Sequence, residues 1–128
     1  MTDQEIKPLR VAVVGACSSG KSNLVSALLD AGFDARHVAQ EHSYVPSMWK
    51  IISKPDILIY LDVEFDNLMA RWPNAQFQPA DLLEQNRRLA HAREHCDLYL
   101  DTNQLNRKGV KEKALAFLSE LNLAPPPH

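Results

Sequence analysis

A small-residue segment near the start of the chain carries residue types that bind polyphosphate. An apolar run and a helical pattern flank the motif G-x-x-x-x-G-K-S, formed by Gly15, Ala16, Cys17, Ser18, Ser19, Gly20, Lys21 and Ser22. Backbone amides of such a loop can donate to several phosphate oxygens at the positive end of a helix. Lys21 would reach the β- and γ-phosphates as a point charge, and the Ser22 hydroxyl is placed to ligate Mg²⁺. The sequence therefore predicts that residues 15–22, together with Asn23, bind a nucleoside triphosphate and Mg²⁺.

The elements around this motif fit that chemistry. Residues 10–14 are apolar, which predicts a buried strand, and apolar residues recur at helical spacing over 21–31. We expect Gly15 to let the chain leave the strand at unusual dihedral angles, and Gly20 to remove a Cβ where the main chain wraps a phosphate. A chance match in a loop is the alternative, but the strand before and the helix after argue against it. The segment is the Walker A pattern, and the chain resembles the P-loop NTPases.

Hydrophobic periodicity predicts further elements in alternation. We expect strands at 33–41, 56–62 and 97–101, and helices at 46–52, 64–71, 79–95 and 109–121. Alternating strands and helices favour an α/β fold in three layers, α/β/α, with a short and mostly parallel sheet of about four to five strands. In such sheets ligands bind beyond the carboxyl ends of the strands, where the strand order reverses, here around the first strand.

Composition predicts one globular domain over residues 1–128, with a loose arm at 1–8 and a proline-rich tail at 124–128. A net charge of -2 gives no general attraction for nucleic acid or for anionic membranes. No apolar run approaches the roughly 20 residues of a membrane span, and the polar first residues do not form a signal peptide, so we expect a cytoplasmic protein. The two cysteines form no disulfide framework. Cys17 is either redox-sensitive or simply a small residue in the loop.

The second half of the chain is similar to small-molecule kinases of the shikimate and adenylate kinase type. ILIYLDVEFDNLMAR resembles the strand, turn and helix that precede their lid. RRLAHAREHCDLYLDTNQL, followed by VKEKALAFL, resembles their last helix, last strand and C-terminal helix. The chain departs from this pattern in two ways. Between the first helix and DILIYLD, those kinases usually have two strand and helix units, whereas this chain has room for about one. Their lid is also longer than residues 72–78, which take its place here. The resemblance implies a reduced P-loop core in which the second strand lies beside the first.

Arginines are implied to be functional by the same resemblance. In these kinases, arginines at the lid and on the next helix neutralise charge on the transferring phosphoryl group. Arg71, Arg87, Arg88 and Arg93 occupy comparable positions. Arg71 and Arg88 are the favoured candidates, while the alternative for each is a solvated helix face.

Two carboxylates are candidates for binding Mg²⁺ or for activating the hydroxyl group of the phosphoryl acceptor. Asp62 follows an apolar strand as a Walker B aspartate does, although it could equally cap the next helix. Glu41 is predicted at the end of the second strand, within VAQEHSYVPSMW, which resembles the deoxynucleoside kinase segment where a strand ends in Glu-Pro and a tryptophan follows. This chain has His42 instead of that proline. The resemblance implies that Glu41 accepts the proton of an acceptor hydroxyl or holds a water on Mg²⁺, and the alternative is an exposed strand end.

The sequence says less about which nucleotide binds than about where its phosphates would lie. Tyr44, Met48 and Trp49 could form an aromatic wall for a base or sugar, or could pack into the core. Residues Asp101, Thr102 and Asn103 follow the last strand, where related folds contact adenine. Because no Asn-Lys-x-Asp run is present, ATP is favoured over GTP as the nucleotide.

Three functions are consistent with these residues. The first is a phosphotransferase that moves the γ-phosphoryl group of ATP to a small hydroxylated acceptor, with Lys21, Arg71, Arg88 and Glu41 as the catalytic groups. The second is a nucleotide-binding regulatory switch with little or no kinase activity. The third is a degenerate domain that binds phosphate-bearing ligands within a larger assembly. No sequence feature selects the acceptor or the oligomeric state.

Overall fold

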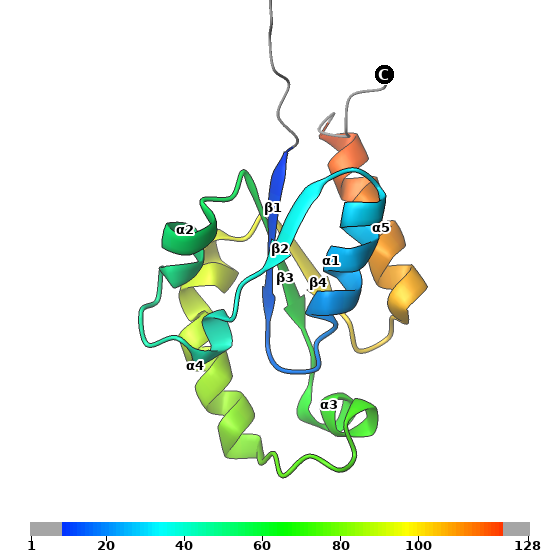
Figure 1. Ribbon diagram of the computed structural model, residues 1–128. Helices are drawn as coiled ribbons and strands as arrows, with labels where there is room; N and C mark the ends of the chain where they lie inside the picture. Colours follow the sequence, from blue (N-terminus) through cyan, green and yellow to red (C-terminus); the bar gives the residue numbers. More distant parts are fainter. Residues whose placement is uncertain (1–8, 122–128) are drawn as a thin grey trace, which may run out of the picture.

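The computed structural model describes residues 9–121 (Figure 1). The elements are, in chain order, β1 (Arg10–Gly15), α1 (Lys21–Asp30), β2 (Asp34–His37), the 3-10 helix η1 (Gln40–His42), α2 (Met48–Ser53), β3 (Ile57–Asp62), α3 (Phe65–Arg71), α4 (Pro79–His95), β4 (Leu98–Asp101) and α5 (Arg107–Glu120). The expected arm at 1–8 and the tail at 124–128 lie outside the described residues. None of the helices in the described part combines the length and the apolar composition that a membrane crossing needs.

The four strands of the described chain form one parallel sheet in the order β2-β1-β3-β4. Val13 of β1 pairs with His37 on one side, and Val14 pairs with Tyr60 on the other. The chain leaves β1 toward β2 on one side and later returns to β3 on the other, so the strand order reverses around β1. The predicted α/β class with a parallel sheet is confirmed, as is the position of the second strand beside the first.

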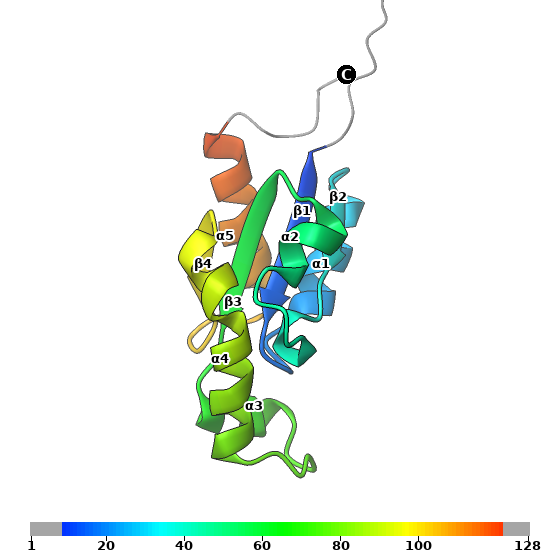
Figure 2. The same ribbon diagram turned by 90° about the vertical axis from the view of Figure 1, so that its left-hand side faces the viewer.

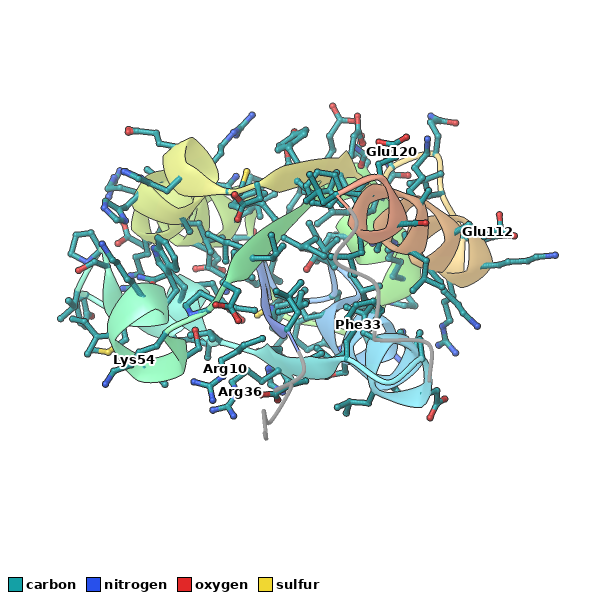
Figure 3. All side chains as sticks on the ribbon, turned by 90° about the horizontal axis from the view of Figure 1, so that it is seen from above. Arg10, Phe33, Arg36, Lys54, Glu112 and Glu120 are labelled. Atoms are coloured by element: carbon teal, nitrogen blue, oxygen red, sulfur yellow. The ribbon has the colours of Figure 1, made fainter. Side chains whose placement is uncertain are left out.

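Helices cover both faces of this sheet. Side chains alternate between the faces of a strand, so Val11 and Val13 pack against α1 and α5, whereas Ala12 and Val14 face the side of α2 and α4. Figure 3 looks down on the start of the strands and shows the two helical layers, with Glu112 and Glu120 of α5 turned away from the sheet. Burial on both faces explains why β1 and β3 are almost continuously apolar.

Capping residues set where two helices begin. Pro79 opens α4 as expected, and the Gln78 amide donates to Asp81 Oδ2 at 2.8 Å in a capping box. Figure 2 shows α4 extending past the end of the sheet toward α3. The last helix, α5, starts at Arg107 rather than at 109, because Asn106 Oδ1 accepts from the Gly109 amide at 2.8 Å.

The second strand is shorter than the predicted range of 33–41. Its ladder ends where the Val38 amide donates to the Val13 carbonyl at 3.0 Å, and the chain then turns into η1. Glu41 therefore lies on a buried 3-10 turn, and its prediction as the end of a strand is wrong. Not every leucine of the helices is buried, since Leu29 of α1 and Leu83 of α4 are 52% and 63% exposed.

Candidate functional site

The loop between β1 and α1, residues 15–22, is called here the phosphate loop, and it lies at the carboxyl end of the sheet (Figure 1). Gly15 is required by crowding, since a Cβ there would lie 2.5 Å from the Leu61 carbonyl oxygen and 2.6 Å from Ser19 Oγ. Gly20 is required by its backbone, which has φ of 104°, while the space around it is open. The reason expected for Gly15 is therefore replaced by crowding, and the backbone of Gly20 adds a conformational reason to the one expected for it. Ser18 also adopts a left-handed conformation, with φ of 60°.

Several amides of the phosphate loop point to no acceptor among residues 9–121. The Ser19 amide donates to the Ala16 carbonyl at 3.1 Å, but the amides of Ser18, Gly20, Lys21 and Ser22 make no hydrogen bond to any other residue that the structure describes. Lys21 and Ser22 belong to the first turn of α1, where backbone amides carry the positive end of the helix dipole. This cluster of donors is suited to an anion.

The ammonium group of Lys21 lies over the same loop. Its Nζ donates to the carbonyl oxygens of Gly15 and Ala16 at 2.7 and 3.1 Å, and to Glu41 Oε2 at 2.8 Å. The side chains of Lys21 and Glu41 are 11% and 5% exposed, so this ion pair is almost fully buried. A charge so poorly hydrated needs its partner.

A buried glutamine holds Glu41 at this position. The Gln40 side chain is 0% exposed, donates to the carbonyls of Val45 and Arg88, and accepts from the Trp49 amide at 2.7 Å. These bonds attach η1 to α2 and α4. Sequence reasoning overlooked Gln40, because a single glutamine in a polar stretch carries no periodic signal.

A second group surrounds Glu41 and Cys17. Cys17 Sγ lies 3.8 Å from His42 Nε2, which lies 3.7 Å from Glu41 Oε2. Gln85 of α4 reaches the same place, where its Oε1 accepts from the Cys17 amide at 3.0 Å and its Nε2 donates to Cys17 Sγ at 3.2 Å. The predictions had placed neither His42 nor Gln85 in the site.

Arg71 contacts the phosphate loop from the end of α3. Its Nη1 donates to the Ser18 carbonyl at 3.0 Å, and its Nη2 donates to the Thr102 carbonyl at 2.7 Å. A pocket of about 460 Å³ opens beside these contacts. We call it the α5-side pocket, and its lining includes Ser19, Gly20, Asn23, Arg71, Thr102, Asn106 and Arg107. The arginine and the loop after β4 thus meet at one cavity.

Arg88 lies on the opposite side of the loop. Its guanidinium stacks on the Tyr44 ring at 4.4 Å, pairs with Glu84 at 3.2 Å and donates to the Glu41 carbonyl at 3.4 Å. Tyr44 and Arg88 line a shallow hollow of about 240 Å³ with Arg87. Of the two alternatives for these aromatic residues, core packing holds for Trp49, which is buried, whereas Tyr44 is 84% exposed, so the two rings do not form one wall.

Asp62 is engaged away from the phosphate loop. Tyr99 Oη donates to its Oδ2, and Arg93 lies 3.9 Å from the same oxygen. Partial burial of the ring and this hydrogen bond raise the pKa of Tyr99 to about 12. No hydrogen bond or ion pair among residues 9–121 joins the Asp62 carboxylate to Ser22. Asp62 does not cap α3 either, since the N-cap is Glu64, two residues later, and the Asn103 side chain accepts from the Glu64 amide.

Comparison of the chain with models of known protein families and with curated proteins gives no match. Function is therefore inferred from the geometry of the phosphate loop and its surroundings.

Proposed function

We propose that the chain is a nucleotide-binding protein with a reduced P-loop NTPase fold, whose residues 15–23 bind the phosphates of ATP. The observation that carries this proposal is the meeting of the unpaired amides of the phosphate loop with the Lys21 ammonium at the start of α1. A triphosphate supplies acceptors for these donors and negative charge for the cation. The position of β2 beside β1 agrees with a kinase-like core that lacks one strand and helix unit.

The α5-side pocket supports a position for the nucleobase. It begins at the phosphate loop, which would fix the phosphates, and it extends to the residues after β4. Its lining offers the Asn106 side chain and the Arg71 guanidinium as polar groups beside apolar Leu24 and Val110. ATP remains favoured over GTP because the sequence lacks an Asn-Lys-x-Asp run.

Ser22 and Glu41 fit a Mg²⁺ ion better than Asp62 does. Ser22 is exposed on the first turn of α1, and Glu41 Oε1 is buried with no hydrogen-bond partner among the described residues. Mg²⁺ favours oxygen ligands and retains several waters, so one hydroxyl and one carboxylate are sufficient protein ligands beside the phosphates. The ion would neutralise charge on the β- and γ-phosphates. Asp62 is already bound by Tyr99.

The chemistry that we propose is transfer of the γ-phosphoryl group to a small hydroxylated acceptor. Lys21 would leave Glu41 Oε2 for the phosphate oxygens, which frees this oxygen to accept the proton of the attacking hydroxyl while Oε1 remains available to Mg²⁺. The new bond forms between that oxygen and the γ-phosphorus, while the bond to the β–γ bridging oxygen breaks and ADP leaves. Arg71 neutralises charge from the α3 side, and Arg88 does so after it releases Glu84.

A regulatory switch is the second candidate, and the Arg71 contacts favour it. This arginine attaches α3 to both the Ser18 carbonyl and the Thr102 carbonyl. A γ-phosphate in the loop would compete for the guanidinium and so move α3 and the short segment 72–78. Such a protein would hydrolyse ATP slowly, to ADP and phosphate, without a phosphorylated acceptor.

Calorimetry with MgATP, MgADP and MgGTP tests the binding proposal. MgATP at 100 times its dissociation constant should stabilise the wild-type chain by about 2.7 kcal/mol. Lys21→Ala should lose most of this binding, whereas Lys50→Ala, an exposed change on α2, should retain it. Wild-type protein that releases no heat with any of the nucleotides would refute the proposal.

Product analysis then separates the two candidates. Glu41→Gln should still bind MgATP, since Lys21 and the amides of the phosphate loop remain to bind the phosphates, but it should lose phosphoryl transfer. Release of inorganic phosphate alone, at an equal rate in wild type and Glu41→Gln, would favour the switch. Full transfer by Glu41→Gln would show that Glu41 is not the proton acceptor.

A further inference from the structure

Three different metal-ligating groups meet beside the phosphate loop. Cys17, Glu41 and His42 each offer one donor atom, and these atoms all lie within 4.8 Å of one another. Cys17 comes from the phosphate loop, while Glu41 and His42 come from η1. The meeting is therefore a product of the tertiary fold and not of neighbours on one helix.

The spacing of these donors is close to that of a transition-metal site. Zinc binds sulfur at about 2.3 Å and imidazole nitrogen or carboxylate oxygen at about 2.0–2.2 Å, so its tetrahedral ligands lie roughly 3.3–3.8 Å apart. Here the sulfur and the imidazole nitrogen are 3.8 Å apart, and the nitrogen and Glu41 Oε2 are 3.7 Å apart. A mixed set of sulfur, nitrogen and oxygen favours zinc or cobalt over Mg²⁺. His42 is 58% exposed in its side chain, so an ion can enter from solvent.

A second, independent observation points to a cation at the same place. Glu41 is only 4% exposed, yet its Oε1 has no hydrogen-bond partner among residues 9–121. A buried carboxylate oxygen without a partner is unfavourable, and a bond to a metal ion would satisfy it. This oxygen belongs to the same carboxylate as Oε2, which lies 3.7 Å from His42 Nε2, so a transition-metal ion bound here without nucleotide would compete with the Mg²⁺ proposed above. Gln85 fixes Cys17 by donating a hydrogen bond to its sulfur and accepting one from its amide. Hydrogen bonds of this kind, from residues that do not bind the metal, orient the ligands of metal sites.

We propose that Cys17 Sγ, Glu41 and His42 Nε2 bind a divalent transition-metal ion, with zinc as the best fit. Binding releases the thiol proton to solvent, because the thiolate is the ligand. The Lys21 ammonium shares the same carboxylate, 2.8 Å from Oε2, so the lysine and the metal compete for it. This inference does not rest on nucleotide binding, and its tests use no nucleotide.

Titration of the purified full chain with Co²⁺ reports on the site directly, because a thiolate bound to cobalt gives a charge-transfer band in the near ultraviolet. We expect the band in the wild type and in Cys96→Ser, and its loss in Cys17→Ser. Zn²⁺ should abolish the wild-type band by displacement. A wild-type protein without the band, a band retained in Cys17→Ser, or a band lost in Cys96→Ser would overturn the proposal.

Two further variants keep the test decisive if Cys17→Ser does not fold, which circular dichroism would reveal. His42→Ala changes an exposed side chain and should weaken cobalt binding by about tenfold or more, since even outer-shell changes weaken metal sites by about 10–100-fold. Lys21→Met removes the competing ammonium and should strengthen cobalt binding. Unchanged affinity in His42→Ala would refute the site, and weaker affinity in Lys21→Met would refute the competition.

Discussion

The two sides of the phosphate loop differ in how far their polar groups are already paired. On the side of α5, a pocket of about 460 Å³ adjoins the first turn of α1. On the side of η1, the Lys21 ammonium, the Glu41 carboxylate and the Gln85 amide are bonded to one another or to the loop. On the α5 side, called here the open side, a ligand can enter without breaking a buried pair. On the η1 side, called here the closed side, a ligand must displace such a pair.

This difference assigns separate tasks to the two sides. The open side is suited to recognition, because a pre-formed pocket requires little reorganisation when a ligand binds. The closed side is suited to control of reactivity, because Lys21 cannot serve a phosphate and Glu41 at once. The proposed phosphoryl transfer and the proposed metal binding would both depend on the Lys21–Glu41 ion pair, whereas the proposed switch would depend on Arg71. The following predictions test how strongly each side relies on its contacts.

Breaking the closed side at its ion pair should have the largest effect. Lys21→Met leaves the Glu41 carboxylate buried without its cation and should lower the free energy of unfolding by about 3 kcal/mol. The double variant Lys21→Met with Glu41→Gln should recover most of that loss, because no unpaired charge remains. Urea unfolding of the apo protein measures both, with Lys50→Met as the exposed control. A loss below about 0.5 kcal/mol in Lys21→Met, which is typical of surface changes, would contradict the buried pair.

Removing one neutral contact from each side should sharpen the comparison. Gln85→Ala removes a buried side chain and leaves the partly buried Cys17 amide without its acceptor, and it should reduce the free energy of unfolding by about 2 kcal/mol. Asn106→Ala, beside the α5-side pocket, removes only the N-cap of α5 and should reduce it by about 1 kcal/mol. Thermal and urea unfolding give both values. Equal losses would mean that the two sides are equally constrained.

The open side should be affected most in its affinity for nucleotide. Arg71→Ala removes a guanidinium from the pocket lining and from the Ser18 and Thr102 carbonyls, and it should weaken MgATP binding about tenfold, or by about 1.4 kcal/mol. Arg87→Ala is the matched control, because that arginine projects into solvent from α4. Calorimetry measures the two dissociation constants. Parallel losses in the two variants would show that only the general positive charge matters.

The order of elements was predictable from the sequence for a simple physical reason. Buried parallel strands and amphipathic helices have distinct periods, and the Walker A residues fix the junction of the first strand and helix. The positions of β3 and α4 were predicted within one residue. The kinase resemblance singled out Arg71 as a site candidate, but its hydrogen bond to the Ser18 carbonyl was not predicted.

The closed side could not be predicted, because it depends on long-range polar contacts. Gln40 and Gln85 are single polar residues whose partners lie far along the chain, and no periodicity reveals such residues. The end of β2 was missed for the same reason. The apolar and polar residues of 33–41 alternate as in a strand, but burial of Gln40 turns the chain into η1. The meeting of Cys17 with His42 follows from that turn.

The smallest expected effect is a change in the ionisation of Tyr99, which contacts Asp62 outside both sides of the loop. This change distinguishes Glu41 from Asp62 as the carboxylate that serves Mg²⁺. The pKa of Tyr99 is raised from 10.0 to about 12 in the folded chain, so the stabilisation from its neutral hydroxyl is complete below pH 10 and is lost as the pH rises toward 12. Absorbance at about 295 nm should show a late tyrosine ionisation that Tyr99→Phe removes. If Glu41 serves Mg²⁺, saturating MgATP should leave this ionisation in place, because Asp62 keeps its hydrogen bond to Tyr99. If the ionisation moves toward pH 10 with MgATP, Asp62 has left Tyr99 for the metal. Mg²⁺ would then be bound by Asp62 and not by Glu41 of the closed side.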